Sequence, residues 1–144
     1  MTQTLHFAEA LLPTGWATYQ TTVPLQEGNN TITAVATNSN GTKSTASIQV
    51  TLDTTPPRVV VDSPPAGHVT TEATITVTGM INDIVVGTVN SQQAQVTVNG
   101  VSAPVVNRSF VAKNVPLQIG NNTIQVIGKD QTGNSATTDR KSVV

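Results

Sequence analysis

A segment of ten residues that occurs twice constrains the fold of this chain more than any other feature. Residues 23–32 read VPLQEGNNTI and residues 115–124 read VPLQIGNNTI, so nine of the ten positions are identical. The two copies begin 92 residues apart, and a spacing of that size suits one small all-β domain. The sequence therefore predicts a chain that is built from copies of one structural unit.

Each copy of the segment predicts a strand, a tight turn and a second strand. Glycine and asparagine stand at the turn because both adopt positive φ at low cost. The residues after the turn alternate between apolar and polar, which is typical of a strand with one buried and one exposed face. A separate Asn-Gly pair is a strong signal for a two-residue hairpin. The predicted turn residues are Gly28, Asn29, Gly120, Asn121, Asn99 and Gly100.

The spacing of strands and turns predicts the fold class and the domains. About seven short strands with turn signals between them predict a complete immunoglobulin-like antiparallel β-sandwich in residues 58–144. Aligned by the repeat, residues 1–53 match only the second half of that unit, so we expect a partial, C-terminal half repeat there. Residues 54–57 read TTPP and predict a proline-rich linker, since proline cannot donate a ladder hydrogen bond.

The last ten residues, 135–144, depart from the repeat. Arg140 and Ser142 stand where the first unit has Ile48 and Val50. The final strand therefore lacks an apolar face, and we expect it either at a sheet edge, guarded by its charge, or partly displaced.

The first repeat has an apolar face on residues 16–52 but no evident second sheet to cover it. One interpretation is that a strand from outside this repeat completes it, by strand addition or by the second unit folding back. The other is that the sequence starts within a domain and that residues 1–15 are disordered.

Taken together, these residues resemble bacterial and archaeal immunoglobulin-like repeats, and most of all the type named after domain B of glucodextranase. The resemblance rests on VNG, a short strand, VPLQ-GNNTI, a strand, a polar turn with glycine, another strand and D-TTPP. It covers residues 57–129 well and residues 16–57 as a half copy. It implies the sandwich fold and a role as a spacer, stalk or adhesion unit of a large exported protein, and it brings no catalytic residues.

Composition argues against several classes of protein. The net charge is −1 and basic residues form no run, so nucleic-acid binding has no electrostatic support. No apolar run approaches the roughly 20 residues of a membrane span. The N-terminus lacks the basic start and apolar core of a signal peptide, so we expect a targeting signal outside this segment.

The polar residues predict neither an enzyme nor a cofactor or metal site. His6 and His68 lie in unrelated contexts, no serine has a nucleophile-elbow pattern, and there is no cysteine for a thiolate site. A calcium site needs several oxygen ligands. The acids that could supply them are expected to be isolated turn residues: Asp53, Asp62, Asp83 and Asp130.

Carbohydrate binding is an alternative function, in which the chain is an accessory module of an exported glycoside-active enzyme. Such a site uses exposed aromatic rings that stack on sugars. Trp16 and Tyr19 are the candidate sugar contacts, but residues three apart on a strand point to opposite faces. A further alternative is a subunit of a self-assembling surface fibre that is completed by strand exchange.

Residues 80–89 are too apolar for a solvated loop. They extend a strand, plug one end of the sandwich or form an interaction patch. The candidate patch residues are Met80, Ile81, Ile84, Val85, Val86 and Val89.

The favoured function is a non-catalytic structural or interaction module outside the cell or at the cell surface. Its expected partner is a protein or a cell surface, and self-association through the incomplete first repeat is a second expectation.

Overall fold

The computed structural model describes the backbone of residues 2–12, 15–87 and 91–144, and the side chains of residues 19–87 and 91–144. Every regular element in these ranges is a β-strand, so none of them is a helix that could cross a membrane. Contacts divide the chain into two compact units, unit 1 (Met1–Asp53) and unit 2 (Thr54–Val144).

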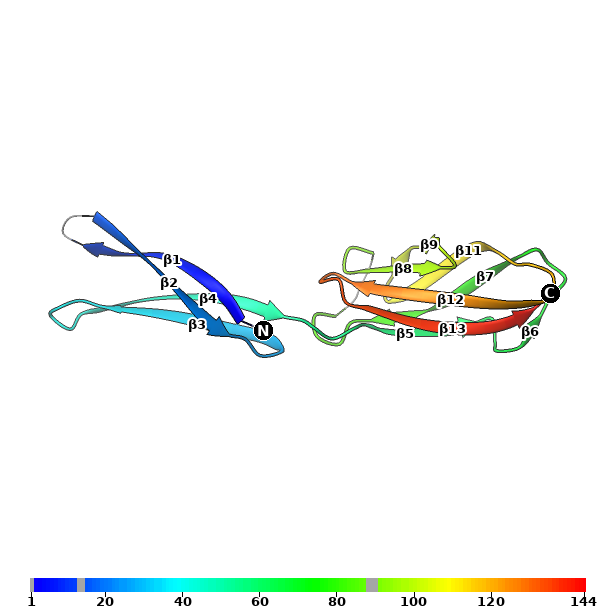
Figure 1. Ribbon diagram of the computed structural model, residues 1–144, viewed down its shortest axis with the longest axis horizontal. Coiled ribbons are helices and arrows are strands. Elements are labelled where there is room, and N and C mark those ends of the chain that lie inside the picture. The colour runs from blue at the N-terminus through cyan, green and yellow to red at the C-terminus, as the bar shows by residue number, and fades with distance from the viewer. Residues whose placement is uncertain (1, 13–14, 88–90) are drawn as a thin grey trace. The chain divides into compact units, whose positions relative to one another are not determined.

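Unit 2 is a sandwich of two mostly antiparallel sheets, as predicted for an immunoglobulin-like fold (Figure 1). One sheet has the strand order β10-β11-β7-β5 and the other has the order β6-β13-β12-β8-β9. The strands are β5 (Arg58–Ser63), β6 (His68–Val69), β7 (Thr74–Asn82), β8 (Ala94–Val98), β9 (Val101–Ala103), β10 (Val105–Val106), β11 (Ser109–Pro116), β12 (Asn121–Asp130) and β13 (Ser135–Val143).

The core of unit 2 lies between these sheets and follows from the alternation along each strand. On β12, for example, Ile124 and Val126 are fully buried whereas Gln125 is exposed. Burial of a valine, isoleucine or phenylalanine side chain contributes about 1.5–3 kcal/mol each. The ring of Phe110 fills the space above Gly79, where an added Cβ would lie 2.5 Å from the ring and 2.1 Å from the carbonyl oxygen of Val60. The largest fully buried apolar side chains are Phe110, Ile81, Ile124, Val77, Val96, Val98, Val105, Val115 and Val126.

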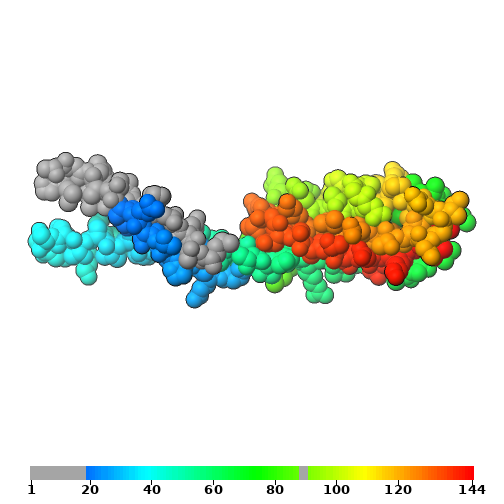
Figure 2. All heavy atoms as spheres, in the orientation of Figure 1, coloured from blue at the N-terminus to red at the C-terminus, as the bar shows by residue number. Residues whose placement is uncertain are grey.

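The last strand is not displaced, since β13 pairs with β12 from Lys129↔Ser135 to Asn121↔Val143. The two-residue β6 pairs with β13 only at Ser142 and Val143. In Figure 2, β12 and β13, coloured orange to red, form one surface of unit 2. Arg140 points across the sandwich and donates a hydrogen bond to the carbonyl oxygen of Val61 on the opposite sheet. A charged residue in an inward position therefore serves as a link between the sheets.

Unit 1 consists of two hairpins. They are formed by β1 (Thr2–Leu12) with β2 (Gly15–Pro24), and by β3 (Gly28–Thr37) with β4 (Lys43–Leu52). On the inner face of the second hairpin, Ile32 is buried and Ala34 and Ala36 are half-buried.

The repeated turn has the same conformation in both units. Gly28 has a φ of 92° and Gly120 a φ of 99°, the positive φ that the sequence predicts at these glycines. The second asparagine of each copy bridges the turn: Asn30 Oδ1 accepts from the Gln26 N–H at 2.9 Å, and Asn30 Nδ2 donates to the Gln26 carbonyl oxygen at 2.7 Å. Asn122 makes the same pair of bonds with Gln118, at 2.8 and 2.7 Å. The sequence pattern predicts the first asparagine of each pair, Asn29 and Asn121, as a turn residue, but the second asparagine makes the bridging hydrogen bonds.

Candidate functional site

The six predicted patch residues have different positions in unit 2. Ile81 is fully buried in the core, so its inclusion in a surface patch is wrong: it lies on the inner face of β7, one residue after the outward-facing Met80. Val85 is half-buried, and Val89 lies outside the described residues. Met80, Ile84 and Val86 are exposed.

Met80 belongs to a row of outward-facing residues that crosses a whole sheet. It pairs with Val60 on β5 and with Ser109 on β11, and Ser109 pairs with Val106 on β10. Directly opposed residues in antiparallel strands have Cβ atoms about 4.5–5.5 Å apart, so these four side chains are neighbours. The exposed fractions are 38% for Val60, 44% for Met80 and 70% for Val106. We call Val60, Met80, Ser109 and Val106 the exposed row.

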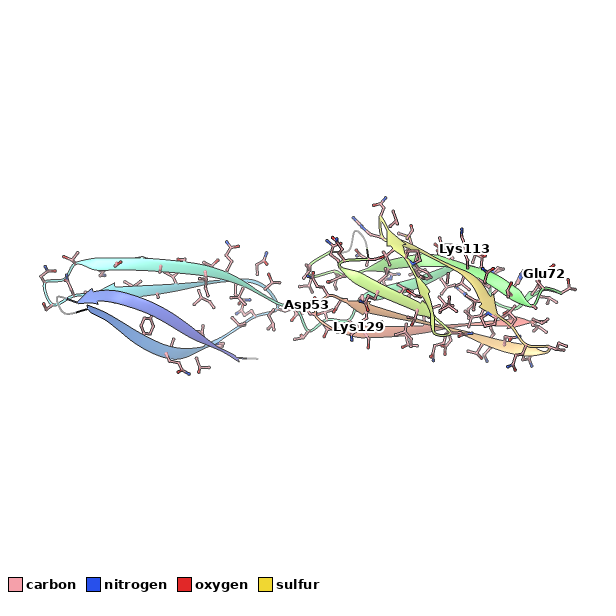
Figure 3. All side chains as sticks on the ribbon, turned by 90° about the horizontal axis from the view of Figure 1, so that it is seen from above. Asp53, Glu72, Lys113 and Lys129 are labelled. Atoms are coloured by element: carbon pink, nitrogen blue, oxygen red, sulfur yellow. The ribbon has the colours of Figure 1, made fainter. Side chains whose placement is uncertain are left out.

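The exposed row is flanked by charged as well as uncharged side chains, since Arg58 and Asp62 are the exposed residues on either side of Val60 along β5. On β11 the outward positions after Ser109 are Val111 and Lys113, both exposed, and Figure 3 labels Lys113 on this strand. Sequence analysis found Met80 but not its neighbours in the row. Val60 and Val106 lie on other strands, and only the strand pairing brings them together.

The turn after β7 is held by Asp83. Its Oδ1 accepts hydrogen bonds from the N–H groups of Val85 at 2.8 Å and Val86 at 3.2 Å. This arrangement leaves the side chains of Ile84 and Val86 exposed. Of the apolar run, Met80 and Ile81 therefore extend β7, whereas Ile84, Val85 and Val86 form neither a strand extension nor a fully buried plug.

Two buried aspartates of unit 2, Asp83 and Asp130, lie close together, with a carboxylate oxygen of each within 4.8 Å of the other. The expectation that these two acids are isolated is therefore wrong, because residues far apart in sequence meet where β7 and β12 end. Calcium takes about six to eight oxygen ligands, and one oxygen from each of two carboxylates is only a small part of such a shell. Asp53 is the last residue of unit 1. Asp62 is exposed on β5 and does not belong to this group.

Asp130 also organises the turn between β12 and β13. Its Oδ1 accepts from Thr132 Oγ1 at 2.9 Å and from the N–H groups of Gly133 and Asn134 at 2.7 and 2.8 Å, while Oδ2 accepts from Asn134 Nδ2 at 3.0 Å. Burial by itself would raise the pKa of Asp130, but these hydrogen bonds outweigh it and lower the pKa below its ordinary value.

Of the two candidate sugar contacts, Trp16 and Tyr19, the structure describes only the side chain of Tyr19. Tyr19 lines a cavity of about 20 Å³ together with Ala34, Ala36, Ser44 and Ala46, so its ring packs beside the inner face of the β3–β4 hairpin. The side chain of Trp16 lies outside the described residues. Phe110 is a core residue.

A shallow hollow of about 280 Å³ lies beside the turn at Asp130. Apart from Ala94 and Gly133, its lining residues carry amides, a hydroxyl and single charges, and none carries an aromatic ring. These groups belong to Gln92, Gln93, Gln95, Lys129, Asp130, Gln131 and Thr132. This lining has hydrogen-bonding capacity but no stacking surface for a sugar ring.

Comparison with known proteins identifies the family. The family model described as glucodextranase, domain B, matches residues 57–144. Bacillopeptidase F of Bacillus subtilis (strain 168) is 36% identical over 128 residues, which cover 88% of this chain and 8% of that protein. The chain thus spans a small part of this relative. A solved structure from Bacteroides ovatus, the SGBP-B protein of a mixed-linkage glucan utilization locus in complex with a mixed-linkage heptasaccharide, aligns with 99% of this chain and 37% of its own at 13% identity.

The TM-score of that alignment is 0.26, which is too low to support an argument about fold or function. The family match has a different weight, because it covers the whole sandwich of unit 2, from the linker prolines to the last strand. This chain belongs to the glucodextranase domain B family.

Proposed function

We propose that this chain is a non-catalytic module of a larger exported protein, which spaces or displays other domains and contacts a protein partner through unit 2. The observation that carries the proposal is the exposed row. Single exposed apolar residues are common on protein surfaces, whereas contiguous apolar side chains on one face are typical of interaction sites. Val60 and Met80 lie side by side, and Val106 lies across Ser109 from them.

The family supports the part of this proposal that concerns the larger protein. A domain B is by its description one domain of a longer enzyme. The similarity to 8% of Bacillopeptidase F likewise places related residues within a much longer chain. A module that is a small part of a longer chain fits the role of a stalk or spacer, and export and extracellular location are part of this proposal.

Replacement of unit 2 within the parent protein separates spacing from contact. In one variant, residues 54–144 are replaced by an unrelated immunoglobulin-like domain of equal length. In a second, Met80 and Val106 are both changed to lysine. In the control, Ile127→Lys places a charge on the other sheet, at an apolar residue that is 38% exposed. We expect the double variant and the domain replacement to lose adhesion or partner binding, and Ile127→Lys to retain it.

Retained binding in the double variant, with unit 2 folded by circular dichroism, would remove the exposed row from the proposal. Retained binding in the domain replacement would leave only the spacer role. A glycan array on the same proteins tests the carbohydrate alternative. Saturable binding that is lost in Tyr19→Ala would replace the proposed function with sugar recognition.

A further inference from the structure

The second hairpin of unit 1 is built like its counterpart in unit 2. With the repeat offset of 92 residues, β3 corresponds to β12 and β4 to β13. The strand register is also the same: Asn29↔Thr51 corresponds to Asn121↔Val143, and Ile32↔Ile48 to Ile124↔Arg140. Unit 2 is therefore a template for what surrounds such a hairpin in a complete sandwich.

The two units differ in how the strands that precede this hairpin are paired. In unit 2, β8 pairs with the edge of β12, from Val126↔Val98 to Asp130↔Ala94, and β11 pairs with β7. By the same offset, β1 begins with the counterpart of β8, and β2 contains the counterpart of β11. In unit 1 these two strands pair with each other, for example at Leu5↔Thr21. Strand β2 is the counterpart of β11, and in unit 2 the neighbour of β11 is β7. In unit 1 the position of a β7-type strand, beside β2, is therefore occupied by β1.

This exchange leaves an edge of β3 open. Residues 34–38 correspond to the five residues of β12 that pair with β8, and among the described residues β3 has only β4 as a ladder partner. Their inner face is also less covered: Ala34 and Ala36 are half-buried, whereas their counterparts Val126 and Gly128 are buried. An open strand edge presents unpaired N–H and C=O groups and binds additional strands.

We propose that unit 1 is an acceptor for a strand pair of the β5–β7 type, supplied by another repeat of the same kind. The bound β7-type strand pairs with β2, as β7 pairs with β11. Strand β1 is then released from β2 and pairs with the open edge of β3 in the register of β8 and β12. That register places Leu5 opposite Val35 and His6 opposite Ala34. Unit 2 itself shows that the β5 and β7 sequences form the sheet that covers this kind of hairpin.

Engineered cysteine pairs distinguish the two positions of β1, because the natural chain has no cysteine. Residues directly opposite in antiparallel strands have Cα atoms about 4.5–5.5 Å apart, within the range of about 4.4–6.8 Å that a disulfide requires. Leu5→Cys with Thr21→Cys reports the observed pairing. Leu5→Cys with Val35→Cys reports the completed sandwich. Both are made in the full chain.

The probe is a synthetic peptide with the sequence of residues 57–83. A control peptide carries Val61→Asp and Val77→Asp, at two positions that are buried in unit 2. We expect the active peptide to raise the intramolecular 5–35 disulfide about tenfold under mild oxidation and to lower the 5–21 disulfide, since it shifts the population between two pairings. The control peptide should change neither. Protection of the amides of Val35 and Thr37 from hydrogen exchange should rise in parallel with the 5–35 disulfide, since these amides point to the open edge whereas the N–H of Asn38 is already bonded to Thr42 within the hairpin.

Three results would overturn the proposal. The active peptide leaves both disulfides unchanged, or the 5–35 disulfide forms fully without a peptide, which would show that unit 1 closes on its own. The third result is a 5–35 disulfide that forms between two molecules without a peptide. The occupant of the open edge would then be a second copy of the chain rather than a strand pair of the β5–β7 type.

Discussion

The two copies of the repeated segment form the same turn in units of different completeness. In both units glycine has positive φ, and the following asparagine pair leads into a long hairpin of identical register. Ile124 in unit 2 is fully buried, whereas Ile32 in unit 1 retains 8% exposure, and Ala34 is half-buried where Val126 is fully buried. Local sequence is thus sufficient for the hairpin, but burial of its inner face requires the opposing strands.

The lower burial of the inner hairpin face in unit 1 predicts two separate unfolding transitions, in which unit 1 is the less stable unit. The chain offers a direct way to observe this, because its single tryptophan and single tyrosine, Trp16 and Tyr19, both lie in unit 1. Fluorescence therefore follows unit 1, while circular dichroism follows both units.

The largest expected effect separates the cores of the two units. Phe110→Ala removes a fully buried ring from unit 2 and should lower its unfolding free energy by about 3–5 kcal/mol. Urea titration should show an earlier transition by circular dichroism and an unchanged transition by fluorescence. Equal shifts of both signals would mean that the units unfold together and that the comparison between them fails.

A smaller effect is expected from the close approach at Gly79. Gly79→Ala introduces a Cβ that meets the Val60 carbonyl and the Phe110 ring, and overpacking of this kind costs about 1–3 kcal/mol. Thr78→Ala, at the half-buried neighbouring position, is the matched control and should cost less. Thermal unfolding followed by circular dichroism measures both. Equal melting temperatures for the two variants would contradict the tight contact.

The repeated asparagines test whether the turns are equivalent. Asn30→Ala and Asn122→Ala each remove one accepted and two donated hydrogen bonds. Each substitution should destabilise its own unit by about 1–2 kcal/mol, seen by fluorescence for the first and by circular dichroism for the second. Asn121→Ala changes an exposed residue and serves as the control. If only one of the two substitutions strongly lowers the unfolding free energy of its unit, the stabilisation by the asparagine depends on the surrounding sandwich rather than on the turn alone.

The smallest effect depends on pH and on a natural difference between the units. Asp130 in unit 2 corresponds to Asn38 in unit 1, and Asn38 Oδ1 likewise accepts from the backbone of its turn, from Thr42 N at 2.8 Å. Because the pKa of Asp130 is lowered in the folded state, its charge stabilises unit 2 above the ordinary aspartate pKa of about 3.9. That contribution is lost as the pH falls through the lowered folded-state pKa.

Asp130→Asn should therefore cost about 1 kcal/mol at pH 7, and less as the pH is lowered below about 4. Denaturant titrations of unit 2 between pH 7 and pH 2.5 measure this dependence, and unit 1, with Asn38, supplies the internal comparison. A difference between wild type and variant that stays constant over this range would contradict the lowered pKa.

Sequence analysis predicted the sandwich, the family and the turns, because each leaves a periodic or local pattern in the chain. It located Met80 in the candidate surface but also included Ile81, since an apolar run does not show where the strand's alternation places each side chain. It missed Val60 and Val106, which lie on separate strands. Asp83 and Asp130 were expected to be isolated, because closeness in space between distant loops has no local signal in the sequence.

The sequence by itself determined the strands and the positive-φ turns, because these depend on residues that lie close together in the chain. It also determined the repeat, because the two copies are nearly identical. Only the tertiary structure decided which strands became neighbours: β8 beside β12 in one unit, and β1 beside β2 in the other. A strand's backbone groups can pair with any strand that has a suitable edge. The choice therefore depends on which other strands are present to cover the apolar face, and this is a property of the whole assembly rather than of the segment.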